Sequence, residues 1–168
     1  MALSEFTVAG ALVESPDGLL LVQNRRRNGS LDWSTPGGVI DATDESLLHG
    51  LAREVEEETG LHVTAWEGPL YEVRAVAPEL GWSMRCEVHR ALDFHGTLRI
   101  EDPDGIVIDA RFVGDDELAA TLEGNHPWVL EPLAEWLTER WHHDDTRPYG
   151  FHVAGAAPDD VVVTRAEP

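Results

Sequence analysis

The sequence predicts an α/β or α+β sandwich, on three observations. Strand-like segments are mixed with helix-like segments along the chain, an order that indicates a sheet covered by helices and excludes a pure helical bundle. The length of 168 residues suffices for one domain with a substantial core. The hydrophobic content of 42% is that of an ordinary globular protein. We therefore expect one domain over 1–168, with a polar C-terminal extension over roughly 142–168.

Two strands and a tight turn are expected at the start of the chain. Apolar residues predict strands over 6–13 and 19–23, and the Ser-Pro-Asp-Gly sequence at 15–18 is typical of a turn. The second strand is therefore expected to return beside the first as a hairpin. A loop over 24–32 follows and carries three consecutive arginines.

The first helix is expected to end at Gly60, because glycine is common where a helix terminates. The residues that recur at helical spacing before it are Leu48, Leu51, Val55 and Thr59. This stripe is expected to face the core.

The second half of the chain is expected to alternate strands with two helices. The predicted strands are 62–66, 71–77, 83–92 and 106–113, with a turn at 78–81 between the second and third. The predicted helices are 115–121 and 128–141, the latter on apolar residues at helical spacing. Near the C-terminus, 151–154 and 161–164 are expected to add a hairpin or an edge strand.

The acidic segment Arg53–Glu58 carries the candidate chemistry. On a helix of about 3.6 residues per turn, Glu54, Glu57 and Glu58 share one face, whereas Glu56 points elsewhere. Like charges at these spacings destabilise a helix by roughly 0.2 to 0.5 kcal/mol per pair unless a cation lies among them. Because the three glutamates flank the apolar stripe, the pattern favours a divalent-metal site at the edge of a cleft over a solvated acidic face.

Gly38, Glu45 and the segment 53–61 together resemble the Nudix box, the signature of the Nudix hydrolases. The signature is a glycine, five residues, a glutamate, seven residues, and then Arg-Glu-aliphatic-x-Glu-Glu-x-Gly-aliphatic; from Glu45 onward the match is complete. Upstream, six residues separate Gly38 from Glu45. Either the loop 39–44 holds one extra residue, or Asp44 replaces the glutamate and the extra residue follows it. We favour the loop insertion, since a loop absorbs an added residue more cheaply than a helix does.

The resemblance implies the Nudix fold, a mixed β-sheet between helices, and a pyrophosphohydrolase that depends on Mg²⁺ or, alternatively, Mn²⁺. Its implied substrate is a small nucleotide, a nucleoside diphosphate linked to another moiety. The residues that it implies are the catalytic Glu54, Arg53 and Glu57, the metal ligands Glu54, Glu57, Glu58 and the Gly38 carbonyl, and the structural Glu45 and Gly60. Arg53 is expected to join loop and helix through carboxylates such as Glu45, because a guanidinium bridges two oxygens.

The general base has two alternatives. Some members of the family use a glutamate of the box, which here is Glu54, and others use an acid on a distant loop. Glu101, Asp102 and Asp104 are the local candidates for a distant acid, and each is also readily explained as a solvated turn residue.

Substrate contacts are the least specified part of the sequence. Arg25, Arg26 and Arg27 are candidates for phosphate binding, with ordinary surface ion pairs as the alternative. Trp33 is a candidate for stacking on a base, with packing as the alternative.

Composition limits the partners. A formal charge of -20 opposes binding to nucleic acid and so disfavours cleavage of capped or triphosphorylated RNA. No apolar run of about 20 residues and no signal peptide are found, and the lone Cys86 is interpreted as a buried thiol, so we expect no membrane association and a cytoplasmic location. The sequence leaves open a homodimer, and it leaves a non-catalytic Nudix-like nucleotide-binding or regulatory module as the second functional class.

Overall fold

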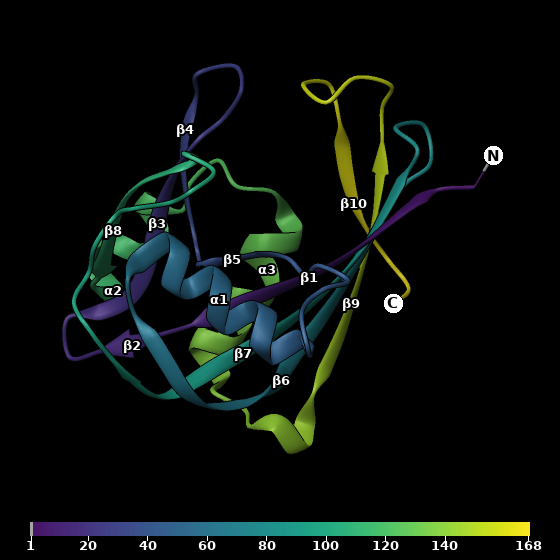
Figure 1. The fold of residues 1–168 in the computed structure, drawn as a ribbon. Helices are drawn as coiled ribbons and strands as arrows, with labels where there is room; N and C mark the ends of the chain where they lie inside the picture. Colours follow the sequence, from purple (N-terminus) through teal and green to yellow (C-terminus); the bar gives the residue numbers. More distant parts are fainter. Residues whose placement is uncertain (1) are drawn as a thin grey trace.

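The computed structural model describes residues 2–168 as strands and helices in layers (Figure 1). The strands are β1 (Ser4–Leu12), β2 (Glu14–Ser15), β3 (Gly18–Arg25), β4 (Leu31–Ser34), β5 (Gly37–Val39), β6 (His62–Ala77), β7 (Trp82–His95), β8 (Val107–Val113), β9 (Arg147–Ala154) and β10 (Val162–Ala166). The helices are α1 (Leu47–Thr59), α2 (Asp115–Thr121), α3 (Pro127–Glu139) and the short 3-10 helix η1 (His143–Asp145).

The strands form two sheets. Six strands in the order β10-β9-β6-β7-β1-β5 make a mixed sheet, in which β1 runs parallel to β7 and β6 runs parallel to β9. In the second sheet, β3 pairs antiparallel with β2, β4 and β8. Helix α1 covers one side of the strands, and α2 and α3 lie on the other (Figure 1). The expected sandwich, with a mixed sheet between helices, is confirmed.

Apolar side chains fill the space on both sides of the sheets. The residues of β1 alternate between the two cores, because successive side chains of a strand point to opposite faces. Ala11 joins Val55 of α1 in the first core, whereas Leu12 joins Trp136 of α3 and Phe151 of β9 in the second. The C-terminal half of β1 is therefore buried on both faces.

Helix α1 begins and ends with side-chain and backbone caps. The Ser46 side chain accepts a hydrogen bond from the backbone N–H of His49 at 3.1 Å. Gly60 ends the helix with φ at 79°, a left-handed conformation that glycine adopts at little cost, as predicted. Three members of the predicted stripe are buried, but Leu48 is 37% exposed, and Leu47 packs against the core in its place.

The expected hairpin of the first two long strands is wrong. A short hairpin does form, because β2 pairs with the start of β3 across the predicted turn. Strand β1, however, belongs to the other sheet, where it pairs with β7 and β5. The partner of β1 lies some seventy residues further along the chain, and local alternation carries no information on such a pairing.

Two other expectations change in the structure. The segments 62–66 and 71–77 belong to one strand, β6, whose pairing with β7 shifts register between Glu67 and Tyr71. The segment from 142 onward is not a polar extension, because β9 pairs with β6 and buries Tyr149, Phe151 and Val153. Polar residues alternate with apolar ones along β9, so average composition conceals a strand. Strand β10 completes the expected hairpin.

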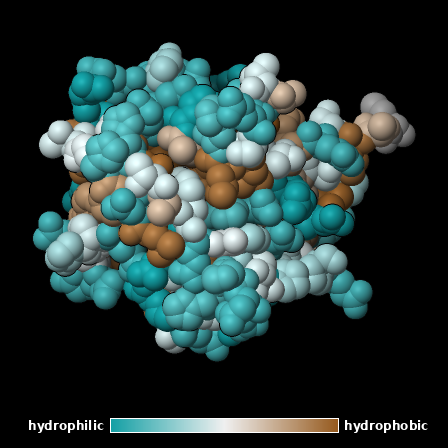
Figure 2. All heavy atoms as spheres, turned by 60° about the horizontal axis from the view of Figure 1, so that its bottom comes forward, coloured by the Kyte–Doolittle hydropathy of each residue, from teal (hydrophilic) through white to brown (hydrophobic). Residues whose placement is uncertain are grey.

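The surface reflects the acidic composition. Polar side chains dominate the face shown in Figure 2, and apolar atoms reach the surface only in separated patches. No helix within residues 2–168 has the length and apolar character needed to cross a membrane.

Strand β7 carries two largely buried titratable side chains, of which His89 has its Nε2 3.9 Å from Glu87 Oε2. Cys86 packs against the core that contains Trp136 of α3, and burial raises the pKa of its thiol to about 12. His89 is buried, and neither ring nitrogen has a hydrogen-bond partner within residues 2–168. Burial lowers the pKa of His89 to about 4, so the imidazole is neutral in the folded protein at neutral pH.

We expect His89→Leu to make folding less sensitive to acid. As the pH falls from 6.5 towards 4, the unfolded chain binds a proton on this imidazole and the folded chain does not, so the parent loses stability across that window. Near pH 4, the parent should have lost roughly 2 kcal/mol more of its free energy of unfolding than the His89→Leu protein. Urea unfolding of both proteins at several pH values measures it, and parallel pH profiles would contradict the prediction.

Candidate active site

The end of β5 and the middle of α1 meet at a close backbone approach. Strand β5 pairs with β1 so that Gly38 lies opposite Ala9. The carboxylate of Glu54 rests against Gly38, and a Cβ atom at position 38 would lie 2.9 Å from Glu54 Cδ. Gly37 adopts φ of 145°, and a Cβ there would lie 2.1 Å from the carbonyl oxygen of Ala9. Gly37 is therefore needed for the loop to reach the acidic face of the helix, whereas a side chain at position 38 would displace the Glu54 carboxylate.

Glu58 is a largely buried carboxyl group in this site. Its Oε2 accepts a hydrogen bond from the backbone N–H of Gly37 at 3.0 Å. Burial raises the pKa of Glu58 to about 8, and the nearby charges of Glu54, Asp102 and Glu57 raise it as well. Burial likewise raises the pKa of Glu54. The site thus concentrates negative charge that the protein itself only partly compensates.

Arg53 compensates the outer part of this charge. Its Nε and Nη2 donate to the two oxygens of Asp44, each at 3.0 Å. Its Nη1 donates to Glu54 Oε1 and to Glu57 Oε2, each at 3.2 Å. The hydrogen bond to Arg53 holds the pKa of Asp44 below its usual range. Next to this pair, a Cβ at Gly50 would already lie 2.6 Å from Asp44 Oδ2, so Asp44 fills the space beside that glycine.

The expected contact between Arg53 and Glu45 does not form. Glu45 is exposed and forms no ion pair within residues 2–168, whereas Asp44 takes the bidentate contact with Arg53. Helix α1 begins only at Leu47, so the extra residue that follows Asp44 still lies in the loop and rotates no helix face. The cost of inserting a residue into the helix therefore gives no reason to prefer Glu45 over Asp44 as the acid of the box.

The acidic side chains suit a hard divalent cation in chemistry and charge, because such ions prefer carboxylate and carbonyl oxygens. Glu58 has no ion-pair partner within residues 2–168, and Glu54 and Glu57 lie on the same side of α1. As they stand, no three His, Cys, Asp or Glu side chains of this part of the chain converge closely enough to hold one ion. Arg53 Nη1 contacts both Glu54 and Glu57, so binding of a cation would require these carboxylates to turn towards Glu58.

The loop before β8 brings the three candidate distant acids near the box. Glu101 lines a surface hollow together with Arg53 and Glu57. Asp102 raises the pKa of Glu58. Asp102 Oδ2 also accepts hydrogen bonds from the backbone N–H groups of Ile106 and Val107, both at 2.9 Å, so it organises the turn.

The other two acids differ from Asp102 in their contacts. Asp104 raises the pKa of Glu54 and therefore lies near the box. Glu101 is exposed and pairs with Arg99 at 3.3 Å.

Among the loop arginines, the one that faces the site is Arg26. All three arginines are exposed, and neither Arg25 nor Arg27 forms an ion pair within the described residues. Arg26 pairs with Asp32 at 2.5 and 2.8 Å, and the charge of Glu58 helps to raise the pKa of its guanidinium. In three consecutive arginines, nothing in the sequence distinguishes the one that β3 and β4 turn inward.

Trp33 packs within the fold. It is half-buried, Arg111 lies over its ring at 4.8 Å, and its carbonyl accepts a hydrogen bond from Asn125 at 2.6 Å. The base-stacking role of Trp33 therefore stays a prediction, with packing as the observed state.

Three residues just before and in α3 were missed from the sequence: Asn125, His126 and Trp128. The rings of His126 and Trp128 stack at 4.1 Å, and Trp128 meets Trp82 edge-on at 6.2 Å. Burial lowers the pKa of His126, and the charge of Arg26 lowers it further, so this segment lies beside the inward arginine. The only local signal for these residues in the sequence was the polar pair Asn125-His126 ahead of Pro127.

A mixed-sheet sandwich with a glycine loop against an acidic, arginine-braced helix defines a class of metal-assisted phosphoanhydride hydrolases. The chain belongs to the Nudix family: the family model for the NUDIX domain matches residues 5–137. It is thus a hydrolase acting on phosphorus anhydrides.

Known proteins resemble this chain in part of the sequence or in fold. A MutT-like protein of Streptomyces ambofaciens is 48% identical over 61 residues, which span 36% of this chain and 37% of that protein. The MutT protein of Bacillus halodurans has a similar structure, with a TM-score of 0.65 over 97% of this chain and 99% of that one, at 24% identity. A MutT Nudix hydrolase of Burkholderia pseudomallei gives 0.58 over 67% and 85%, at 25% identity.

We expect Asp44→Asn to destabilise the protein and Glu45→Gln to leave it unchanged. The first substitution weakens two hydrogen bonds between charged groups and should lower the free energy of unfolding by about 1 to 3 kcal/mol. The second alters an exposed side chain and should stay within about 0.5 kcal/mol. Chemical denaturation compares the two, and a larger effect of Glu45→Gln would restore the alternative assignment.

Proposed function

We propose that this chain is a Mg²⁺-dependent pyrophosphohydrolase of small nucleotides, with Mn²⁺ as an alternative metal. The observation that carries the proposal is the meeting of Glu54 and the largely buried Glu58 with the glycine loop, with the charge of Glu57 close to them. Burial of an acid without a cationic partner costs stability, so a cation is the natural complement of Glu58. A nucleoside diphosphate linked to another moiety is the proposed substrate.

The ligands proposed for the cation are Glu54, Glu57, Glu58 and the carbonyl oxygen of Gly38. When bound, a divalent cation polarises a phosphoryl group and lowers the pKa of water. The Gly37 N–H orients the Glu58 carboxylate through its 3.0 Å hydrogen bond. Glu54 is the proposed general base, with Glu101, Asp102 and Asp104 of the neighbouring loop as the alternatives.

Arg53 is proposed to position these carboxylates. Its bidentate contact with Asp44 anchors the guanidinium to the loop, and its remaining donor orients Glu54 and Glu57. It acts through other residues and makes no proposed contact with the substrate.

The nucleotide is proposed to lie towards Arg26 and the segment that begins α3. Arg26 is close enough to Glu58 for the charge of that carboxylate to raise the pKa of the guanidinium, and an arginine binds phosphate oxygens well. The exposed Arg25 and Arg27 are the secondary candidates. The stacked His126 and Trp128 offer flat rings for a base.

The partners and the location of the protein stay predictions. The net charge of -20 favours a small substrate over nucleic acid. A cytoplasmic location and the choice between monomer and homodimer rest on the sequence alone.

One observation favours the second functional class, a non-catalytic nucleotide-binding module. Arg53 contacts Glu54 and Glu57 directly, so the structure describes a state in which two proposed ligands are already paired. A module that never binds a metal would keep this pairing when it binds a nucleotide.

Glu54→Gln should lower the rate of hydrolysis by orders of magnitude, because it removes a proposed metal ligand and the proposed base. Glu56→Gln is the matched control: Glu56 lies on the same helix but points to His62, at 3.2 Å, and should retain full activity. Manganese binding measured by electron paramagnetic resonance provides a readout apart from activity, and Glu54→Gln should weaken it. Undiminished turnover in a folded Glu54→Gln protein would exclude the assignment.

A hydrolysis panel distinguishes the two functional classes. Nucleoside triphosphates, nucleotide sugars, ADP-ribose and dinucleoside polyphosphates should be tested with Mg²⁺ and with Mn²⁺. We expect turnover of at least one compound and complete loss on addition of a chelator. Nucleotide binding without turnover of any compound would establish the binding module instead.

A further inference from the structure

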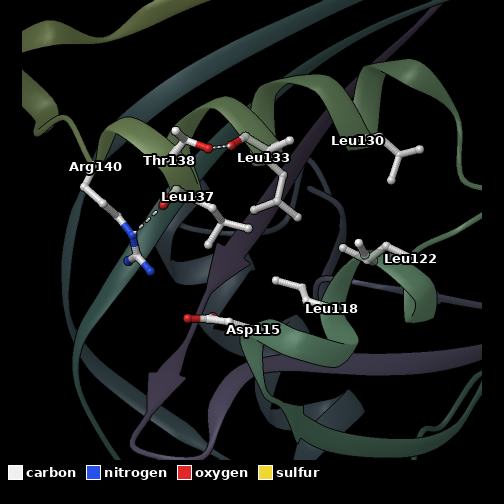
Figure 3. A pocket seen from close by; sticks show the side chains of 10 residues that line it. Asp115, Leu118, Leu122, Leu130, Leu133, Leu137, Thr138 and Arg140 are labelled. Atoms are coloured by element: carbon white, nitrogen blue, oxygen red, sulfur yellow. Dashed lines mark hydrogen bonds between the residues drawn. The ribbon is translucent and has the colours of Figure 1, made fainter.

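A pocket of about 520 Å³ lies between α2 and α3, on the side of the sheets opposite α1. Five leucines line it: Leu118 of α2, Leu122 at the end of α2, and Leu130, Leu133 and Leu137 of α3. Figure 3 shows these side chains pointing into the space between the helices. The volume lies within the roughly 300 to 1,000 Å³ typical of small-molecule sites.

Polar groups gather at one end of this pocket, where Asp115, Thr138 and Arg140 lie (Figure 3). Arg140 is already paired, since its Nη1 donates to both oxygens of Glu14 at 2.9 and 2.8 Å. The Thr138 hydroxyl donates to the carbonyl of Ala134. Asp115 is exposed and has no ion pair within residues 2–168, whereas Arg140 shares its partner Glu14 with Arg90, so Asp115 is the free carboxylate at this end.

Two simpler explanations do not account for the whole pocket: that Asp115 only stabilises α2, and that the pocket is the docking site of a further helix. An acid in the first turn stabilises a helix through the macrodipole, which explains Asp115 but not an apolar hollow beside it. A docked helix of about 10 to 12 Å diameter would rest on the rim, because Leu118, Leu122 and Leu133 at the floor are at most 6% exposed. A narrow molecule reaches the floor.

We propose that this pocket binds an amphiphilic amine, with the apolar chain among the leucines and the ammonium group beside Asp115. From Leu130 to Thr138, α3 rises about 12 Å, which sets the length of the chain. The net charge of -20 attracts a cation and repels the corresponding carboxylate. The pocket lies in a different layer from the acidic helix, so the proposal does not rest on the proposed hydrolysis.

The test compares three ligands with the same chain: octylamine, octanol and octanoate. Titration calorimetry should rank them in that order, and the methyl signals of the pocket leucines should shift in nuclear magnetic resonance spectra. Equal binding of all three would overturn the assignment of the head group.

Ala119→Trp and Ala120→Trp form a matched pair of variants. Both alanines are exposed on α2, but only Ala119 lines the pocket. Ala119→Trp should weaken octylamine binding about tenfold, because the indole displaces methylene groups from the leucines, whereas Ala120→Trp should bind as the parent does. Equal affinities of the two variants would overturn the site.

Asp115→Asn and Asp116→Asn isolate the charge. Asp116 follows on the same helix but does not line the pocket. Asp115→Asn should weaken octylamine binding about threefold and leave octanol unaffected, while Asp116→Asn changes neither. Equal losses in both variants would reduce the effect to the general charge of the protein. Absence of amine binding, with self-association that Ala119→Trp abolishes, would assign the surface to a second copy and overturn the proposal.

Discussion

The arrangement of the acidic helix depends on one guanidinium group. In a chain with 32 acidic and 12 basic residues, four carboxylates of the box would repel one another if no cation lay among them. Arg53 holds Asp44 in the loop with two hydrogen bonds and reaches Glu54 and Glu57 with its third nitrogen. Loop and helix are thus joined by charge, and the inner Glu58 is left without a cation.

The second constraint is the close backbone approach at the glycine loop. A side chain at Gly37 would collide with the backbone of β1, and one at Gly38 would displace the Glu54 carboxylate. Antiparallel pairing with β1 carries this loop into the mixed sheet, and the C-terminal half of β1 is buried on both faces. A strand packed on both sides therefore supports the candidate metal site, whereas the leucine pocket lies in the opposite layer.

Much of the site was predictable because it is local. Helical spacing placed Glu54, Glu57 and Glu58 on one side, and a glycine marked the end of α1. Spacing could not decide between Asp44 and Glu45, because the start of the helix at Leu47 leaves either residue in the loop. It also could not select Arg26 from its neighbours or connect Asn125 and His126 with a site about a hundred residues earlier.

The sequence by itself determined the Nudix box, the segments that form most strands and helices, and the acidic character of the molecule. These properties depend on residues within one or two turns of each other, where periodicity and capping act directly. Only the tertiary structure decided that β1 pairs with β7, that residues 147–154 complete the sheet, and that Arg53 pairs with Asp44. Such contacts are selected by burial and by charge over the whole fold, and the free energy of each depends on partners that are distant in the chain.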